Sequence, residues 1–412
     1  MRLIGTLLVA LAVAVAGCAS DGAGEVATTK SGRPTASTSE GETPTPGPVV
    51  TPTADGSGWR YVYVSEQPDS ELLDAAAAGP REAWAVGTAS GKVLLLRYDG
   101  SNWRQVEPPA GLGAVPAGSQ VRVAASAPDN VWLLAPKRVT GDQVDSMAAF
   151  RWDGSRWQEV GAELDTGDVA DFAVLGPGDA WTVHGVGQPY ARHWDGQAWR
   201  KVRLPADAQS LSGTGPGDLW AVGARHEGPA ITNDEMSQPA AMHWDGQTWR
   251  LVPTPTYAFA EPKPPEGSAG LDAVAALSGD NVWAVGEHTF NHGEADDEPD
   301  DPPPILLHWD GRQWTKRSAP ESRYCCPKLA GDGSGGVLLA AGGPWFQDTW
   351  RLDAAGRRTH LPRLPAVPEL KRSQFFGLEA LADVPRTGTV WAVGRLEADG
   401  GFWRRAVIAQ YH

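Results

Sequence analysis

From residue 55 to the C-terminus, apolar residues occur in short runs separated by Gly, Pro, Asp, Asn and Ser. Runs such as 271–276 (LDAVAA), 281–286 (NVWAVG) and 305–309 (ILLHW) have the length and β-branched or aromatic content of strands. The chain also holds 49 Gly, 34 Pro and 19 Trp, a composition that favours short strands and tight turns. The pattern therefore predicts an all-β domain over residues 55–412.

Two motifs alternate along this region. A D-G-x-x-W motif, in which Gly accepts the positive φ of a hairpin turn, occurs at 55–59, 99–103, 153–157, 195–199, 245–249 and 310–314, with a degenerate copy at Asp353. A W-A-V-G motif or a close variant occurs at Trp84, Trp132, Trp181, Trp220, Trp283 and Trp391, with Leu338 in the degenerate copy. The repeat tryptophans that we interpret as structural are Trp84, Trp103, Trp157, Trp181, Trp199, Trp220, Trp249, Trp283, Trp314 and Trp391.

Successive Asp positions of the first motif are 44, 54, 42, 50, 65 and 43 residues apart, a period that suits four-stranded propeller blades. Small residues at 75–78, 123–126, 210–213 and 273–276 suit the narrow end of a blade near a central axis. Residues 406–412 resemble the third strand of a blade, and the D-G-x-x-W that should follow them stands instead at 55–59. The sequence thus predicts a seven-bladed β-propeller of four-stranded antiparallel blades, closed by residues 59–64 joining the last blade.

The blades resemble kelch propeller repeats. In that class glycines end the second strand and an aromatic-Asp…Trp pattern spans the hairpin between strands three and four. The matching residues here are Gly286 after Val285, then Trp309, Asp310 and Trp314, although most copies carry one glycine where the class has two. The resemblance covers residues 55–412 and implies the fold, but no particular activity, because propellers host many functions.

The N-terminus has the features of an exported lipoprotein. Arg2 precedes the apolar run 3–17, which is shorter than a membrane span and fits a secretory signal. The run ends at Val15-Ala16-Gly17-Cys18, which resembles a bacterial lipobox, of the kind found in actinobacteria, and implies lipid attachment to Cys18 and removal of residues 1–17. A plain signal peptide with a chance Cys is the alternative. Lipidation would place the protein on the extracytoplasmic side of the cell membrane.

Residues 18–54 are rich in Ser, Thr, Pro, Gly and Ala and contain no aromatic side chain. Such a segment cannot bury enough surface to offset its ordering entropy, so we expect a disordered linker. The formal net charge is −15, with no basic cluster, which argues against a nucleic-acid partner.

Loop lengths separate the two faces of the predicted propeller. The turns between strands one and two and between strands three and four are short, whereas the other loops vary, with long examples at 106–120, 136–146, 224–239, 253–270, 287–304 and 360–375. Repeat proteins concentrate insertions on the binding face. We therefore expect one functional face, built from the second-to-third-strand (b–c) loops and the blade-to-blade (d–a) loops.

Three groups of candidate residues fall on these loops. His288, His292, Glu294 and Asp296 could form a Ca²⁺ or transition-metal site, but the loop lacks the ordered spacing of an EF-hand, which favours a solvated acidic insert. Cys325 and Cys326 could form a strained vicinal disulfide near the channel mouth, or remain thiols, or bridge to another chain. Aromatic and basic residues that suit glycan or peptide recognition, with local loop packing as the alternative, are Tyr257, Phe259, Tyr324, Trp345, Phe346, Phe375, Phe376, Arg225 and His226.

The sequence contains no nucleophile elbow, H-E-x-x-H motif or phosphate-binding Gly loop. No catalytic residue or certain cofactor follows from it. The leading hypothesis is a membrane-anchored binding propeller for an envelope glycan, peptide or protein. A carboxylate-dependent glycan hydrolase or lyase on the same face is the alternative, since distant loops can bring two carboxylates together. A scaffold for other envelope proteins is a third, and it would present a broad apolar patch.

Overall fold

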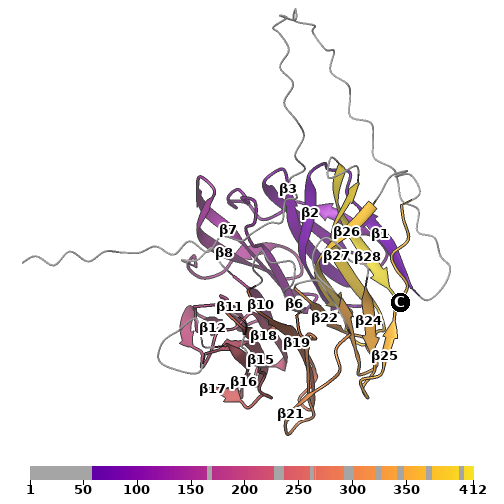
Figure 1. Cartoon of the computed structure of the whole chain (residues 1–412). Helices are drawn as coiled ribbons and strands as arrows, with labels where there is room; N and C mark the ends of the chain where they lie inside the picture. Colours follow the sequence, from indigo (N-terminus) through magenta and orange to yellow (C-terminus); the bar gives the residue numbers. More distant parts are fainter. Residues whose placement is uncertain are drawn as a thin grey trace, which may run out of the picture. The chain divides into compact units, whose positions relative to one another are not determined.

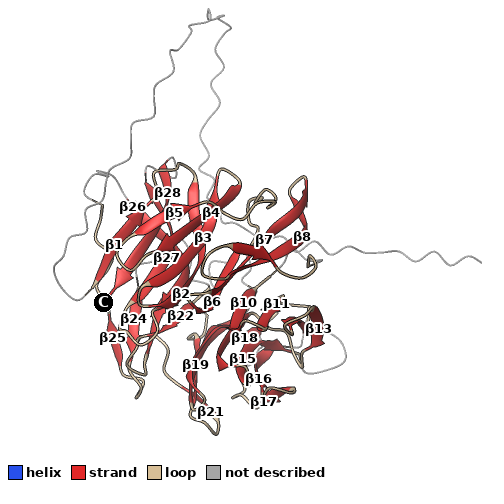
Figure 2. Ribbon diagram, turned by 180° about the vertical axis from the view of Figure 1, so that it is seen from behind, coloured by secondary structure: helices blue, strands red, loops and turns tan. Residues whose placement is uncertain are grey.

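The computed structural model describes residues 58–412 with the exception of 165–168, 227–235, 260–263, 265, 292–300, 321–325, 341–347, 368–373 and 399–402. Every regular element in these residues is a β-strand (Figure 2). The strands form seven separate four-stranded antiparallel sheets, so the predicted all-β, seven-bladed propeller is confirmed (Figure 1). The described residues contain no helix long and apolar enough to cross a membrane.

Each sheet is one blade, and in blades one to six the strands run in chain order from the innermost to the outermost. Blades one to three consist of β2 (Ser70–Gly79), β3 (Glu82–Ala89), β4 (Lys92–Tyr98) and β5 (Trp103–Val106); β6 (Arg122–Ala127), β7 (Asn130–Thr140), β8 (Gln143–Trp152) and β9 (Trp157–Glu159); and β10 (Asp171–Gly176), β11 (Asp179–Val183), β12 (Tyr190–Trp194) and β13 (Trp199–Arg203).

Blades four to six consist of β14 (Ser210–Gly215), β15 (Asp218–Arg225), β16 (Gln238–Trp244) and β17 (Trp249–Val252); β18 (Ser268–Ser278), β19 (Asn281–Thr289), β20 (Ile305–Trp309) and β21 (Trp314–Lys316); and β22 (Lys328–Gly331), β23 (Val337–Ala340), β24 (Thr349–Leu352) and β25 (Arg358–His360). Blade seven consists of β26 (Gln374–Asp383), β27 (Val390–Ala398), β28 (Trp403–Tyr411) and β1 (Trp59–Val64).

The two ends of the propeller domain meet in blade seven. Strand β1 pairs antiparallel with β28, beginning with Trp59 opposite Tyr411, and Arg60 donates hydrogen bonds to the side chain of Gln410. Tyr61 is buried and its ring meets Phe376 edge-on. The N-terminal strand therefore completes the last blade, as the sequence predicted, and covers the edge of β28.

Tryptophans fill the interfaces between most neighbouring blades. Trp84 of blade one lies 5.3 Å from Trp152 and 5.1 Å from Trp157 of blade two, measured between ring centroids. The same arrangement joins Trp132 to Trp194 and Trp199, Trp181 to Trp244 and Trp249, Trp220 to Trp309 and Trp314, and Trp391 to Tyr98 and Trp103. The repeat motifs are thus the contact surfaces of the blades, and each hydrophobic core lies between two blades.

Blade six departs from this pattern because it lacks both motif tryptophans. Leu338 occupies the position of the second-strand Trp and packs in one core with Trp59 and Tyr411 of blade seven. On its other side, Trp283 of blade five packs with Val337, Leu339 and Leu352 of blade six and faces the turn at Gly356. Blade six is consequently joined to its neighbours by smaller side chains than the other blades.

The Asp-Gly turns explain why the first motif recurs. In blade one, Oδ1 of Asp99 accepts hydrogen bonds from the amides of Ser101 and Asn102, and Gly100 has φ of 93°. Four further motif Asp residues make the same pair of bonds: Asp153, Asp195, Asp245 and Asp310. In the degenerate copy, Asp353 accepts instead from the amides of Ala355 and Arg357, two and four residues on. Asp fixes the turn and Gly supplies the left-handed backbone that it requires.

One predicted loop is wrong. Residues 136–146 form the end of a β-hairpin, because β7 continues to Thr140, β8 begins at Gln143, and Val139 pairs with Val144. Alternating side chains in this segment let both strands extend beyond the blade. The hairpin tip nevertheless lies on the b–c side of blade two, where the long loop was expected.

Candidate functional site: the central cavity

A cavity of about 1900 Å³ lies among the innermost strands of the blades. Its wall includes residues of β2, β6, β10, β14, β18, β22 and β26, which succeed one another around the ring. At one end it is bounded by loop and hairpin residues 117–120, 140, 142–145, 184–186 and 326–327. These segments are d–a and b–c connections, so the cavity opens toward the face that the loop lengths singled out.

The inner strands line the cavity mainly with Ala, Gly and Ser, but one position carries larger polar side chains. It lies ten residues before the repeat Trp, or before Leu338 in blade six. In blades one to six it holds Asp74, Arg122, Asp171, Ser210, Ala273 and Lys328. The backbone register agrees, because each of these residues lies two before the partner of the repeat Trp or of Leu338.

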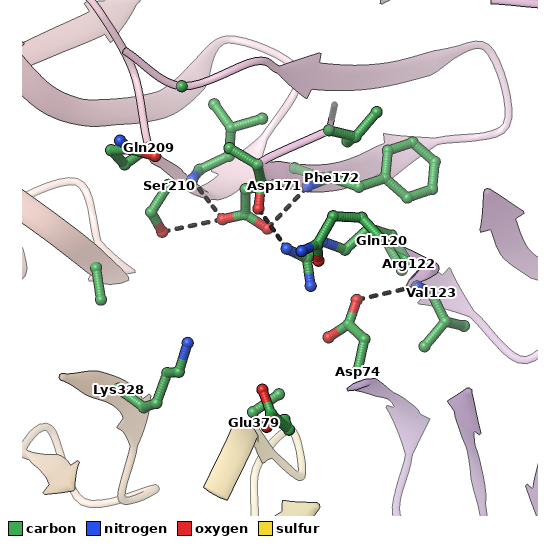
Figure 3. Close-up of a pocket in the computed structure, with 18 of the residues that line it drawn as sticks. Asp74, Gln120, Arg122, Val123, Asp171, Phe172, Gln209, Ser210, Lys328 and Glu379 are labelled. Atoms are coloured by element: carbon green, nitrogen blue, oxygen red, sulfur yellow. Dashed lines mark hydrogen bonds between the residues drawn. The ribbon is translucent and has the colours of Figure 1, made fainter. Parts of the chain in front are cut away.

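These polar side chains connect neighbouring inner strands (Figure 3). Asp74 accepts a hydrogen bond of 3.0 Å from the amide of Val123 on β6, and Nη2 of Arg122 donates one of 2.7 Å to the carbonyl of Ala170, just before β10. Asp171 accepts bonds from the hydroxyl of Ser210 and the amide of Leu211 on β14. The row ties blades one to four together at the axis.

Figure 3 shows Arg122 between Asp74 and Asp171, with Lys328 and Glu379 on the opposite side of the cavity. Burial raises the pKa of Asp74 to about 6, against the opposing effect of the Arg122 charge, while the nearby Asp171 raises it further. Burial also raises the pKa of Glu379, although Nη1 of Arg395 lies 2.6 Å from its Oε1. Burial therefore disfavours the charged form of both carboxyl groups.

Acidic side chains dominate the described lining. Eight Asp or Glu residues line the cavity, against two basic residues, Arg122 and Lys328. The acidic residues are Asp74, Asp142, Asp145, Asp171, Asp272, Asp383, Glu287 and Glu379. A cleft lined by one sign of charge concentrates ions of the opposite sign.

The aromatic candidates that the structure describes lie away from this cavity. Tyr257 and Phe259 pack around His288, with ring centroids 5.3 and 4.5 Å from it, and Phe290 meets Phe259 edge-on. Phe375 and Phe376 belong to β26, where Phe376 is buried in the core between blades six and seven. None of these rings lines the cavity, so the described residues provide no aromatic platform at its mouth.

Of the metal candidates, only His288 lies in the described part of the chain. It is 8% exposed in its aromatic surroundings, and burial together with the charge of Lys316 lowers its pKa. His292, Glu294 and Asp296 lie outside the described residues, and among those that are described no group of His, Cys, Asp and Glu could hold a metal ion. The metal site therefore stays a prediction.

Cys326 lines the cavity at the edge of blade six. Its φ of 64° is left-handed, and its amide donates a 3.1 Å hydrogen bond to Oε1 of Glu287 on β19. Cys325, Tyr324, Trp345 and Phe346 lie outside the described residues, so the vicinal disulfide and these aromatic contacts stay predictions.

The two basic loop candidates stand at the end of β15. Nη1 of Arg225 donates a 2.6 Å hydrogen bond to the carbonyl of Pro239, and Thr254 donates to the same carbonyl. Arg225 thus joins three segments of blade four. His226 follows it, half-buried, and neither residue lines the cavity.

The histidines that recur with the repeat have structural partners. Nε2 of His193 lies 2.9 Å from Asp179, that of His243 lies 2.8 Å from Asp218, and that of His308 lies 2.9 Å from Asn281. Arg97 and Glu82 make the equivalent contact in blade one. This repeated side-chain pair holds the third strand of a blade to the start of its second strand.

No family model matches the chain, and a search of curated proteins found no match. Solved propellers do match over most of their length. A structure of YCF48 bound to D1 peptide is 14% identical, with 87% of this chain and 98% of that chain covered and a TM-score of 0.51. Streptogramin B lyase is 11% identical, with 86% and 97% covered and a TM-score of 0.53.

The WD40 β-propeller domain of Doa1 is 10% identical, with 86% of this chain and 97% of that chain covered and a TM-score of 0.50. At such identities these likenesses show the fold alone, and propellers with one fold serve as binding modules and as enzymes. What the chain has in common with these solved structures is therefore the propeller fold.

Proposed function

We propose that the protein is a binding propeller held on the outer side of the cell membrane by a lipid at Cys18, and that its partner is an envelope component. The observation that carries the proposal is the polar cavity of about 1900 Å³ open toward the b–c and d–a loops. Ligand sites are concave and combine a mostly apolar wall with a few placed polar groups. The cavity has alanine-rich walls, and its charged groups come from separate blades.

Among envelope partners, a peptide or protein suits the cavity better than a glycan. Sugar recognition commonly uses aromatic platforms, and Phe172, itself 6% exposed, is the only Phe, Tyr or Trp in the described lining. The propeller of YCF48, which shares the fold, has been captured with a D1 peptide. A scaffold is less favoured, because the exposed large hydrophobics of the described residues are the isolated Val186 and Leu251.

Val186 and Leu251 offer a matched test in the cell. Val186 is 65% exposed at the cavity mouth, whereas Leu251 is 42% exposed on β17, an outermost strand. A photo-crosslinking residue at 186 should give a discrete adduct in the envelope, and the same residue at 251 should not. Absence of an adduct at 186, or equal adducts at both sites, would contradict a partner at the cavity mouth.

Cys18 provides the test of localisation. The Cys18→Ala variant should lose incorporation of an alkyne-labelled fatty acid and move from the membrane fraction to the soluble fraction. Retention of both label and membrane association in the variant would contradict lipid attachment at Cys18.

A carboxylate-dependent glycan hydrolase or lyase is the second candidate. The raised pKa of Asp74, with the carboxyl group of Asp171 nearby, favours it, because acid–base catalysis uses pairs of carboxyl groups. Both oxygens of each carboxylate, however, already accept hydrogen bonds from the backbone or from Ser210. We therefore assign these residues first to holding the strands together.

A further inference from the structure

The charge of the cavity indicates the chemistry of its occupant. Building on the proposed binding function, we propose that the cavity receives a positively charged segment of a peptide or protein, whose lysine or arginine side chains meet the carboxylates at the mouth and along the inner strands. The proposal rests on three properties of the described lining: its charge balance, the existing partners of its charged groups, and the nature of the surface between them.

The lining has four times as many acidic residues as basic ones, eight against two. The two basic residues do not offset this excess. Arg122 is committed to the carbonyl of Ala170 and lies between Asp74 and Asp171, which leaves Lys328 as the remaining cation of the described wall. Cations supplied by an occupant would stabilise a cavity of this charge, whereas a polyanionic segment would be repelled.

The carboxylates fall into two groups by their present contacts. Asp74 and Asp171 bind backbone amides, and Glu379 pairs with Arg395. At the mouth, Asp142 lies exposed in the β7–β8 turn and makes no hydrogen bond or ion pair with the described residues, and Glu287 accepts only the Cys326 amide from them. The mouth carboxylates are therefore the ones available to a first cationic contact.

The surface between the carboxylates suits long basic side chains. Ala75, Ala76 and Ala77 of β2, Ala124 and Ala125 of β6 and Ala380 of β26 line the wall, so small residues lie between the charged positions. Lysine and arginine bury their methylene stems along apolar surface and keep the charged head beside polar groups. Small apolar walls interrupted by carboxylates provide both surfaces.

The state of the inner carboxylates agrees with this occupant. Burial raises the pKa of Asp74 and of Glu379, so their surroundings disfavour the charged forms. A cation placed beside them would lower both pKa values and would itself be bound more tightly above pH 6. Binding of a basic segment should therefore strengthen as pH rises from 5 to 7.

Fluorescence anisotropy of a labelled hexalysine peptide with the full chain in detergent tests the proposal. We expect saturable binding that weakens steeply with salt, because exposed charge interactions are screened, and no binding of hexaglutamate. The double variant Asp142→Asn, Glu287→Gln should weaken the affinity roughly tenfold. Gln at 287 retains an oxygen acceptor for the Cys326 amide, so this variant should keep its thermal midpoint.

Asp129→Asn is the matched control. Asp129 is an exposed residue of the β6–β7 turn in the same blade as Asp142, at the other end of β7. The control removes a charge of the same kind from the opposite face and should leave affinity unchanged. An equal loss in the control and in the mouth variant would overturn the proposal, since it would mean general attraction to an acidic protein.

Failure of this inference is distinct from failure of the proposed function. Absence of hexalysine binding combined with a discrete adduct at 186 would reject the cationic occupant and retain the binding site. Absence of both would reject both. An adduct to a partner segment rich in Lys or Arg, lost in the Asp142→Asn, Glu287→Gln variant, would support both.

Discussion

The polar residues at the axis both connect neighbouring blades and form the polar wall of the cavity. Asp74 shows that its burial in this position has an energetic cost. Its carboxylate oxygens accept bonds from the amides of Ala75 and Val123, which join blades one and two. Its burial nevertheless raises its pKa to about 6 from an ordinary 3.8. The fold thus accepts a costly charge at the axis in return for contacts between blades and a polar cavity wall.

The stability of the propeller should reflect this cost through pH. Because the folded pKa of Asp74 lies above the unfolded value, the folded state binds more protons between pH 4 and 6, and this group lowers the free energy of unfolding as pH rises through that window. A shift of about two units corresponds to about 3 kcal/mol. The Asp74→Asn variant should gain stability relative to wild type between pH 4 and pH 7, measured by urea unfolding at each pH.

The comparison at pH 3 serves as the internal control, because there Asp74 is mostly protonated in both states and only the exchange of a protonated carboxyl for an amide separates the two proteins. A stability difference that stays constant from pH 3 to pH 7 would show that the charge of Asp74 costs nothing.

Asp195→Asn should show the opposite dependence of stability on pH. Turn hydrogen bonds and Arg200 lower the pKa of Asp195 to about 2, so its charge stabilises the fold above pH 4 and that contribution is lost as pH falls toward 2.

The sequence identified the structural residues better than those of the cavity. Recurrence marked the turn aspartates and the tryptophans, since each performs the same task in several blades. The sequence analysis did not identify the polar residues of the cavity wall, because their position carries different side chains in different copies: Asp74, Arg122, Asp171 and Lys328. Alignment of the copies on the repeat Trp could have found them, as a polar position ten residues before it within strands of otherwise small residues.

At the scale of the elements, most neighbouring blades pack together through groups of three aromatic side chains, mostly tryptophans. One side chain comes from the second strand of a blade, and the other two come from the hairpin between the third and fourth strands of a neighbouring blade. Trp84 is 1% exposed between Trp152 and Trp157. The Trp84→Ala variant should lose roughly 3–5 kcal/mol of stability, through lost burial and the cavity left behind. Denaturant unfolding measures the loss.

Trp84→Leu reproduces the situation of Leu338 in blade six and should cost less than Trp84→Ala, because Leu refills part of the space. Leu338→Ala provides the corresponding truncation in the degenerate blade and should cost about 2–5 kcal/mol. Equal stability of wild type and Trp84→Ala would contradict the claim that these aromatic groups stabilise the packing between blades.

Strand positions were predictable because hydrophobic pattern and turn chemistry agreed in most copies. The predicted strand 305–309 coincides with β20, and 59–64 coincides with β1. Residues 136–146 were misassigned because their Lys, Arg, Gln and Asp residues resemble a loop, whereas the alternation of Val139, Val144 and their polar neighbours supports a hairpin. The geometry of the ring decides which loops lie near the axis. The periodicity of the sequence does not predict that geometry.

At the scale of the whole molecule, the contact that holds the ring shut is made by residues from opposite ends of the domain. Strand β1 covers the edge of β28 and brings Trp59 and Tyr61 into the core between blades six and seven. Removal of residues 55–64 should therefore expose an unpaired strand edge, lower the thermal midpoint and cause concentration-dependent association. Light scattering and thermal unfolding measure both effects.

A circular rearrangement separates the loss of this strand from the loss of its location in the chain. In blade one, the sequence Tyr98-Asp-Gly-Ser-Asn-Trp103 connects the third strand to the fourth, and Tyr98 pairs with Trp103. Residues 55–64 placed directly after Tyr411 would give Tyr-Asp-Gly-Ser-Gly-Trp, which has the same spacing and the same pairing as Tyr411 with Trp59. This chain should regain the monomeric state and thermal midpoint that the deletion loses. If it remains as unstable as the deletion, the N-terminal strand must stabilise the ring by something other than completing blade seven.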